Sequence, residues 1–136
     1  MNMSVQMIFV NLPVKDLNKS KEFFAQVGFT FNPQFTDENA TCMVIHDNIF
    51  AMLQVEDYFK SFTKKEIPNT ENSSEVIVAL SVESREQVDH YVNNAFAAGG
   101  KHSKEPKDHG FMYEWGFEDL DGHLWEFIWM DSKALE

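Results

Sequence analysis

Hydrophobic and polar residues follow the same order twice along this chain of 136 residues. Each copy predicts a strand, a polar break, an amphipathic helix that ends at a glycine, and then further strands. The first strand of one copy, Val10-Asn11-Leu12-Pro13-Val14, corresponds to Val78-Ala79-Leu80-Ser81-Val82 of the other, an offset of 68 residues. A weak repeat of this size indicates that one supersecondary unit is used twice, and the seam between two such units is a natural place for a ligand site.

The first copy carries clear helix boundaries. Asp16 is a favourable N-cap and Gly28 a favourable C-terminal stop. After the last strand of this copy, apolar residues recur at i, i+3, i+4 and i+7 over 55–62, which predicts a short additional helix. The predicted strands of this copy lie at 7–14, 29–35, 41–45 and 49–55.

The second copy has the same elements with stronger local signals. Ser84-Arg85-Glu86-Gln87 reads as a capping box, in which serine and glutamine side chains accept hydrogen bonds from backbone N–H groups. The helix that follows ends at Gly99-Gly100, and Asp121-Gly122 is a hairpin turn signal. The predicted strands lie at 75–82, 111–117 and 124–130.

These elements predict one α+β domain, 1–136, built from two βαβββ modules. The first module covers 5–63, with its short extra helix near 55–63, and the second covers 76–131. Pro68 and a run of Asn, Thr and Ser indicate a linker over 64–75, and 132–136 form a tail.

Composition narrows the class of protein. A hydrophobic content of 43% with 14% aromatic residues supports a packed core. No apolar run approaches the length of a membrane span, no signal peptide is evident at Met1-Asn2-Met3-Ser4, and Cys42 is the only cysteine. We therefore expect a cytoplasmic protein.

The charge balance excludes one class of partner. The chain has 22 acidic and 11 basic residues, a formal net charge of −11, which repels phosphate backbones and argues against nucleic acid as a partner. The acidity either keeps the protein soluble or lines, in part, a groove for a cationic ligand.

Two motifs carry a family resemblance. The first is Val14-Lys15-Asp16-Leu17 with Ser20, Phe23-Phe24 and Gly28-Phe29. The second is the run from Glu118 to Glu126, close to a D-P-D-G-n-x-x-E closing motif with Leu120 where proline is usual. Together they resemble the vicinal oxygen chelate superfamily, which holds glyoxalase I, bleomycin-resistance proteins and extradiol dioxygenases. The chain is most similar to small bacterial proteins described as predicted lactoylglutathione lyases.

The resemblance implies mixed sheets that curl around a central cavity, often across a homodimer, and a divalent metal such as Zn, Ni, Fe or Mn. The family holds this metal with the first and last strands of each module. Those positions fall on Phe9, Met52, Ile77 and Glu126 in this chain. Only Glu126 can bind such a metal, and none of the five histidines shows HxH or HxxxH spacing. We therefore predict that the metal site is lost.

Strand alternation predicts what lines the cavity instead. The candidate ligand-binding residues, including two aromatics at the mouth, are Phe9, Asn11, Met52, Gln54, Ile77, Ser81, Tyr113, Trp115 and Glu126. Glu126 stands among bulky apolar residues, where an ionised carboxylate is costly unless paired. It is a candidate general base, or it pairs with a lysine or a backbone amide as a relic of a metal-binding ancestor.

Three functions remain open. The first is a metal-free protein that binds a small organic molecule, as in the bleomycin-resistance branch. The second is a lyase or isomerase that uses Glu126 as its base. The third is a metal-dependent lyase or dioxygenase with displaced ligands, against which the residues argue.

Overall fold

The computed structural model describes residues 3–135, which form two compact units. The first unit comprises the chain up to Ala25 together with Phe29–Ile67, and the second comprises Gln26–Gly28 together with the chain from Pro68 onward. Met1 and Asn2, and Glu136 of the predicted tail, lie outside the described residues.

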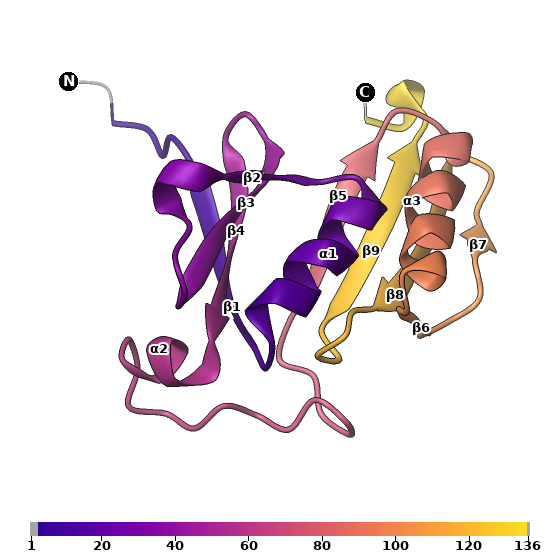
Figure 1. Cartoon of the computed structure of the whole chain (residues 1–136). Coiled ribbons are helices and arrows are strands. Elements are labelled where there is room, and N and C mark those ends of the chain that lie inside the picture. Colours follow the sequence, from indigo (N-terminus) through magenta and orange to yellow (C-terminus); the bar gives the residue numbers. More distant parts are fainter. Residues whose placement is uncertain (1–2, 136) are drawn as a thin grey trace. The chain divides into compact units, whose positions relative to one another are not determined.

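The first unit contains a four-stranded mixed sheet in the order β1-β4-β3-β2 (Figure 1). The first and last strands of the module pair in parallel, while the other pairs are antiparallel. The bounds are β1 (Ile8–Val14), α1 (Leu17–Val27), β2 (Thr30–Asn32), β3 (Ala40–His46), β4 (Ile49–Val55) and α2 (Glu56–Lys60). The Asp16 carboxylate accepts a hydrogen bond from the Lys19 N–H at 3.1 Å, as the N-cap signal predicts.

Two elements of the first unit are shorter than predicted. The strand expected over 29–35 ends at Asn32, because proline has no N–H to donate and Pro33 opens a 3-10 turn to Phe35. The Asn32 side chain caps this turn by accepting from the Gln34 N–H at 3.0 Å. The helix expected over 55–62 ends at Lys60, where the Ser61 hydroxyl donates to the Tyr58 carbonyl oxygen.

The second unit contains a five-stranded mixed sheet with the path β5-β9-β8-β6, and β7 also pairs with β8. The bounds are β5 (Ile77–Val82), α3 (Arg85–Ala97), β6 (Lys101–His102), β7 (Lys107–Asp108), β8 (Met112–Glu118), β9 (Leu124–Met130) and a 3-10 turn η2 (Ser132–Leu135). β6 and β7 were not predicted, because two residues are too few for an alternation pattern.

Helix α3 begins where the capping signal predicts. The Ser84 hydroxyl accepts from the Gln87 N–H at 3.1 Å, and the Gln87 carboxamide accepts from the Glu83 N–H at 2.9 Å. The glutamine thus reaches one residue further back than in the standard box. The helix packs on β8 and β9 (Figure 1), and its buried stripe comprises Val88, Val92 and Ala95.

The two faces of the second sheet differ in burial. Trp125 and Phe127 of β9 lie beneath α3, and the Phe127 ring stacks on Tyr91 of the helix at 4.7 Å between ring centroids. The opposite face of the sheet carries the alternate residues of β9, among them Glu126. The structure thus has the predicted α+β architecture of two βαβββ modules, with sheets that do not close. None of its helices within 3–135 has the length and apolarity to cross a membrane.

Candidate functional site on the second sheet

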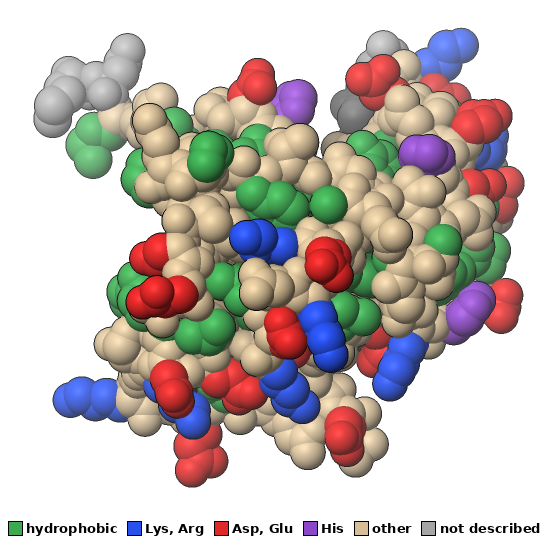
Figure 2. All heavy atoms as spheres, in the orientation of Figure 1, with side chains coloured by type: hydrophobic (Ala, Val, Ile, Leu, Met, Phe, Trp, Pro, Cys, Tyr) green, Lys and Arg blue, Asp and Glu red, His purple; other side chains and the backbone are tan. Residues whose placement is uncertain are grey.

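Glu126 lies at the centre of the sheet face that α3 leaves uncovered. Its neighbours across the strands are Ala79 of β5 and Gly116 of β8. Two further glutamates, Glu114 and Glu118, share this face, because they stand two residues on either side of Gly116. Acidic and basic side chains are interspersed over the side of the molecule that Figure 2 shows. The Glu126 face carries three carboxylates on two strands.

Gly116 lets the backbone of β9 approach β8 closely beside Glu126. A Cβ added at position 116 would meet the Trp125 carbonyl oxygen and would lie 3.2 Å from Cγ of Glu126. A glycine inside a strand often marks a close approach of another backbone, and here the Trp125 carbonyl oxygen takes the space with the Glu126 side chain beside it. The glycine is therefore part of the site.

Lys104 holds the Glu126 carboxylate. Its Nζ forms an ion pair with Glu126 Oε1 and lies 3.8 Å from Oε1 of Glu114. The Glu126 side chain is only 19% exposed and that of Lys104 33% exposed, so the ion pair offsets the desolvation of a largely buried carboxylate. The interpretation of Glu126 as a carboxylate paired with a lysine thus agrees with the observed contact.

The backbone of Lys104 is fixed as well. Trp115 donates from its indole Nε1 to the Lys104 carbonyl oxygen at 3.1 Å. The Trp115 ring in turn packs edge-on against Phe96 of α3, with 5.5 Å between centroids. The lysine therefore reaches Glu126 from an anchored segment.

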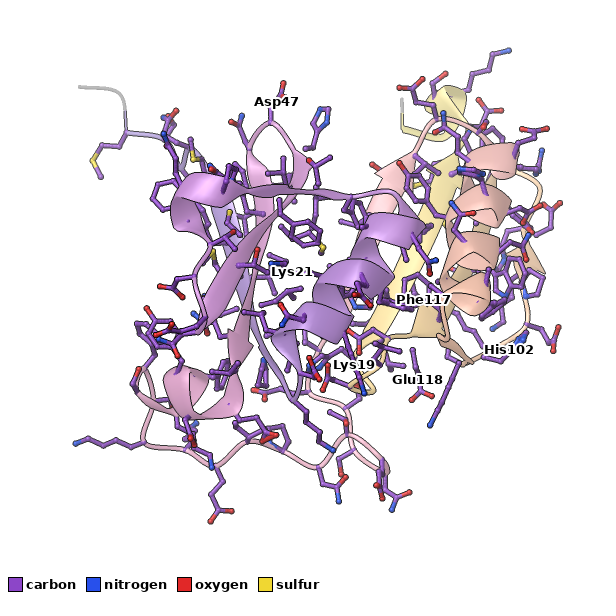
Figure 3. The ribbon with its side chains drawn as sticks, in the orientation of Figure 1. Lys19, Lys21, Asp47, His102, Phe117 and Glu118 are labelled. Atoms are coloured by element: carbon purple, nitrogen blue, oxygen red, sulfur yellow. The ribbon has the colours of Figure 1, made fainter. Side chains whose placement is uncertain are left out.

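A cavity of about 330 Å³ opens beside this ion pair, near the lower limit of small-molecule sites. It combines an apolar wall, two carboxylates and one ammonium group. Glu118, at the end of β8, and His102, in β6, are labelled in Figure 3. The lining residues are Ile77, His102, Ser103, Lys104, Glu118, Leu124, Trp125 and Glu126.

A buried aspartate organises the turn that leads into β9. Asp119 is 3% exposed and accepts hydrogen bonds from the Trp125 indole at 3.0 Å and from the backbone N–H groups of Asp121 and His123. Burial raises the pKa of Asp119, while His123 and these donors act in the opposite direction. Thr70 of the expected linker also joins this turn, because its hydroxyl donates to the Asp121 carbonyl oxygen at 2.6 Å.

The structure distributes the predicted pocket residues over different surfaces. Ile77 and Glu126 line the cavity together, and Ser81 lies on the same sheet face without lining it. Tyr113 and Trp115 have the opposite strand parity, so they lie on the α3 side of the sheet and not beside Glu126. Tyr113 donates to Asp89 of the helix at 2.6 Å.

The other four predicted residues belong to the first unit. Phe9 is 49% exposed, and its ring stacks on that of Phe50 at 4.9 Å. Gln54 is buried and donates from Nε2 to Oδ1 of Asn11 at 3.2 Å, while Met52 pairs with Asn11 across the strands. This face of the first sheet is apolar with one neutral amide pair. Cys42, whose thiol pKa is raised by burial, fits an inert core residue.

Among the site residues that sequence reasoning missed are Lys104 and Gly116. A glycine inside an otherwise regular strand pattern was a usable signal for a close approach. Lysines at positions 101, 104 and 107 recur every third residue, which also marks the segment, although their targets depend on strand register.

The side chains do not fit the metal that the family resemblance implies. Phe9, Met52 and Ile77 offer no donor for a hard or borderline cation, and Glu126 is held by Lys104. Over residues 3–135, no three or more His, Cys, Asp or Glu side chains are grouped so that they could hold a metal ion.

Comparison with known proteins agrees with this fold. The profile of a family described as bleomycin resistance protein-like N-terminal matches residues 6–46. A hypothetical protein from S. aureus is 31% identical, with 93% of this chain and 95% of that chain covered and a TM-score of 0.77. No curated protein sequence matches the chain.

More distant solved structures share the fold. A glyoxalase/bleomycin resistance protein/dioxygenase family enzyme from Burkholderia phytofirmans is 17% identical, covers 90% of this chain and 96% of its own, and has a TM-score of 0.76. A fosfomycin resistance protein from Listeria monocytogenes is 19% identical, with coverages of 96% and 98% and a TM-score of 0.65. The chain therefore has the glyoxalase/bleomycin-resistance/dioxygenase fold that its resemblance to the vicinal oxygen chelate superfamily implies, and its residues 6–46 match a bleomycin resistance protein-like family.

Proposed function

We propose that this protein binds a small organic molecule on the Glu126 face of the second sheet, without the divalent metal common in its superfamily. The observation that carries the proposal is the ion pair between Glu126 and Lys104. Glu126 is the one family metal-ligand position that still holds a donor, and a lysine ammonium takes the place where a cation would stand.

The relatives support a binding or resistance role. One family profile and one structural neighbour are named for resistance to bleomycin and to fosfomycin, respectively. A protein that only sequesters its ligand needs an apolar cavity with a few polar points, and the cavity beside Glu126 has that composition. A cytoplasmic location fits a chain with one cysteine, which is buried.

An enzymatic role is the second candidate, because Glu126 lines a cavity that a substrate could enter. As a general base, Glu126 would first have to separate from Lys104 and then accept a proton next to a carbonyl group of a lyase or isomerase substrate. A dioxygenase reaction would require a metal that these side chains do not fit.

We further propose a homodimer. Apolar side chains on the first strands of both modules are about half exposed, among them Ile8, Phe9 and Ile77. Exposed apolar side chains of this kind are buried when subunits associate. Light scattering on the purified protein checks this, and a monomeric mass across the concentration range would contradict it.

Metal titration tests the proposed function. Untagged protein is stripped with a chelator and titrated with Zn²⁺, Ni²⁺, Fe²⁺ and Mn²⁺, with elemental analysis of the protein as purified. We expect no stoichiometric binding, and the same result for Glu126→Gln. Tight 1:1 binding that Glu126→Gln abolishes would overturn the metal-free proposal.

A fragment screen by NMR tests the ligand site. Neutral and charged fragments should shift the methyl signals of Ile77 and Leu124, which line the cavity, and leave those of Val88 on the buried side of α3 unchanged. A screen in which no fragment moves the two cavity methyls would contradict the location of the site.

A further inference from the structure

The segment between α3 and β8 brings three lysines to the three glutamates of the Glu126 face. Lys101 is the strand partner of Glu118, and Lys107 is the strand partner of Glu114. Directly opposite residues in an antiparallel pair point to the same face, so each end of the segment places a lysine beside a glutamate. Lys104, midway between them, forms the ion pair with Glu126.

The middle of this segment bulges away from β8. His102 pairs with Phe117 and Lys107 pairs with Glu114, so residues 103–106 stand opposite only two residues of β8. One of those two is Gly116, which has no side chain to fill the space. The bulge and the glycine together let the Lys104 side chain reach Glu126 on the neighbouring strand.

We propose that the Lys104 ammonium group is an internal stand-in for the cationic group of the ligand. The ligand class is a small organic ammonium ion with an apolar body, which displaces Lys104 from Glu126 and lies against Ile77 and Leu124. The inference rests on the proposed function, since it names the ligand of that same cavity. Once Lys104 has moved away, the carboxylates of Glu118 and Glu126 in the cavity wall favour a cation over an anion.

Lys104 has a second position to which it can move. Oε1 of Glu114 lies 3.8 Å from the Lys104 Nζ, on the side away from Glu118 along β8. The lysine side chain is one-third exposed and flexible, so a shift towards Glu114 keeps its charge paired while it releases Glu126. His109 Nε2 lies 3.7 Å from the same Glu114 oxygen and would share that carboxylate.

This arrangement predicts that removing Lys104 strengthens binding. Benzylamine, protonated at neutral pH, is the probe, and benzyl alcohol is its neutral counterpart of the same shape. By calorimetry at low ionic strength, Lys104→Met should bind benzylamine about tenfold more tightly than wild type does, because the internal competitor is gone. The affinity for benzyl alcohol should change by less than about twofold, because this neutral probe does not compete with the Lys104 ammonium for Glu126.

Three variants make the test specific. Glu126→Gln combined with Lys104→Met should lose the gain in benzylamine affinity, since the carboxylate that binds the ammonium group is gone. Glu114→Gln alone should weaken benzylamine binding, since Lys104 then has no second partner. Lys133→Met removes the same charge at an exposed site in η2 and should leave both affinities unchanged.

The outcomes separate the two proposals. An equal gain for benzyl alcohol would show that the lysine only fills space, which overturns the cation inference and leaves the ligand site standing. Unchanged or weaker benzylamine binding by folded Lys104→Met would also overturn it. Near-ultraviolet circular dichroism checks folding, and Lys104→Gln replaces Lys104→Met if the apolar side chain prevents folding.

Discussion

The two modules share one topology and differ at the same register position of their sheets. In the first, Met52 stands opposite Cys42 and beside Asn11. In the second, Glu126 stands opposite Gly116 and beside Ala79. The Glu126 carboxylate lies between two small strand neighbours, glycine and alanine, and pairs with Lys104. The comparison teaches that a buried charge requires vacated neighbours as well as a counter-ion.

The strongest test of this comparison fills the vacated position. Gly116→Ala should lower the free energy of unfolding by about 3 kcal/mol, because the added methyl group collides with the Trp125 carbonyl oxygen and crowds Glu126. The matched change in the first module, Cys42→Ala, only removes a buried sulfur atom and should cost about 1 kcal/mol. Urea unfolding of both variants provides the measurement, and similar losses would refute the role given to Gly116.

A second test moves the carboxylate to the other module. Met52→Glu places a charge opposite the buried Cys42 and beside the neutral Asn11, and should destabilise the protein by about 2 kcal/mol at neutral pH. Glu126→Met, the reverse exchange, should change stability by less than about 1 kcal/mol, since the Lys104 ammonium that it leaves behind is one-third exposed and keeps Glu114 within 3.8 Å.

Met52→Gln is the control for this exchange, because it keeps the length of the side chain without the charge. Its loss should be smaller than that of Met52→Glu in the same urea experiment. If Glu126→Met proves the more damaging exchange of the two, the ion pair contributes more to the fold than the comparison implies.

The third and smallest effect concerns the other face of the second sheet. Burial and the hydrogen bond to Asp89 raise the pKa of Tyr113 to about 12. A tyrosine with a raised pKa in the folded state contributes stability that is complete below its ordinary pKa near 10 and is lost as pH rises towards 12. Stability should therefore decline over that interval.

The near-ultraviolet absorbance of tyrosinate follows this titration. Asp89→Asn should move the Tyr113 midpoint downwards, and Tyr113→Phe should remove it. Tyr58→Phe, in the first module, should leave the Tyr113 midpoint unchanged. A Tyr113 midpoint that does not respond to Asp89→Asn would show that the hydrogen bond is not a cause of the shift.

Sequence alone was sufficient for the architecture because its signals are local. Alternation located seven of the strands, and the caps at Asp16 and Ser84 located the starts of α1 and α3. The predicted strand over 29–35 included Pro33, but proline has no N–H to donate and β2 ends one residue before it, at Asn32.

The site was predictable only in part because it depends on register. Periodicity placed Glu126 and Ile77 on one face, but it could not show that the bulge at 103–106 would deliver Lys104 to Glu126. Tyr113 and Trp115 were assigned to the pocket because they are aromatic. Since Gly116 pairs with Glu126, these two residues, at the alternate positions of β8, lie on the face that α3 covers.

The parallel pairing of the first and last strands in each module has a consequence for biosynthesis. Ile8 pairs with Ile49, and Ile77 pairs with Leu124. Each sheet can therefore be completed only after the last strand of its module has been synthesised. On the ribosome, the leading strand of each module remains unpaired until its distant partner emerges, which slows folding through the entropy of closing a long loop. Half-made modules with bare apolar edges are therefore the species that a chaperone would meet.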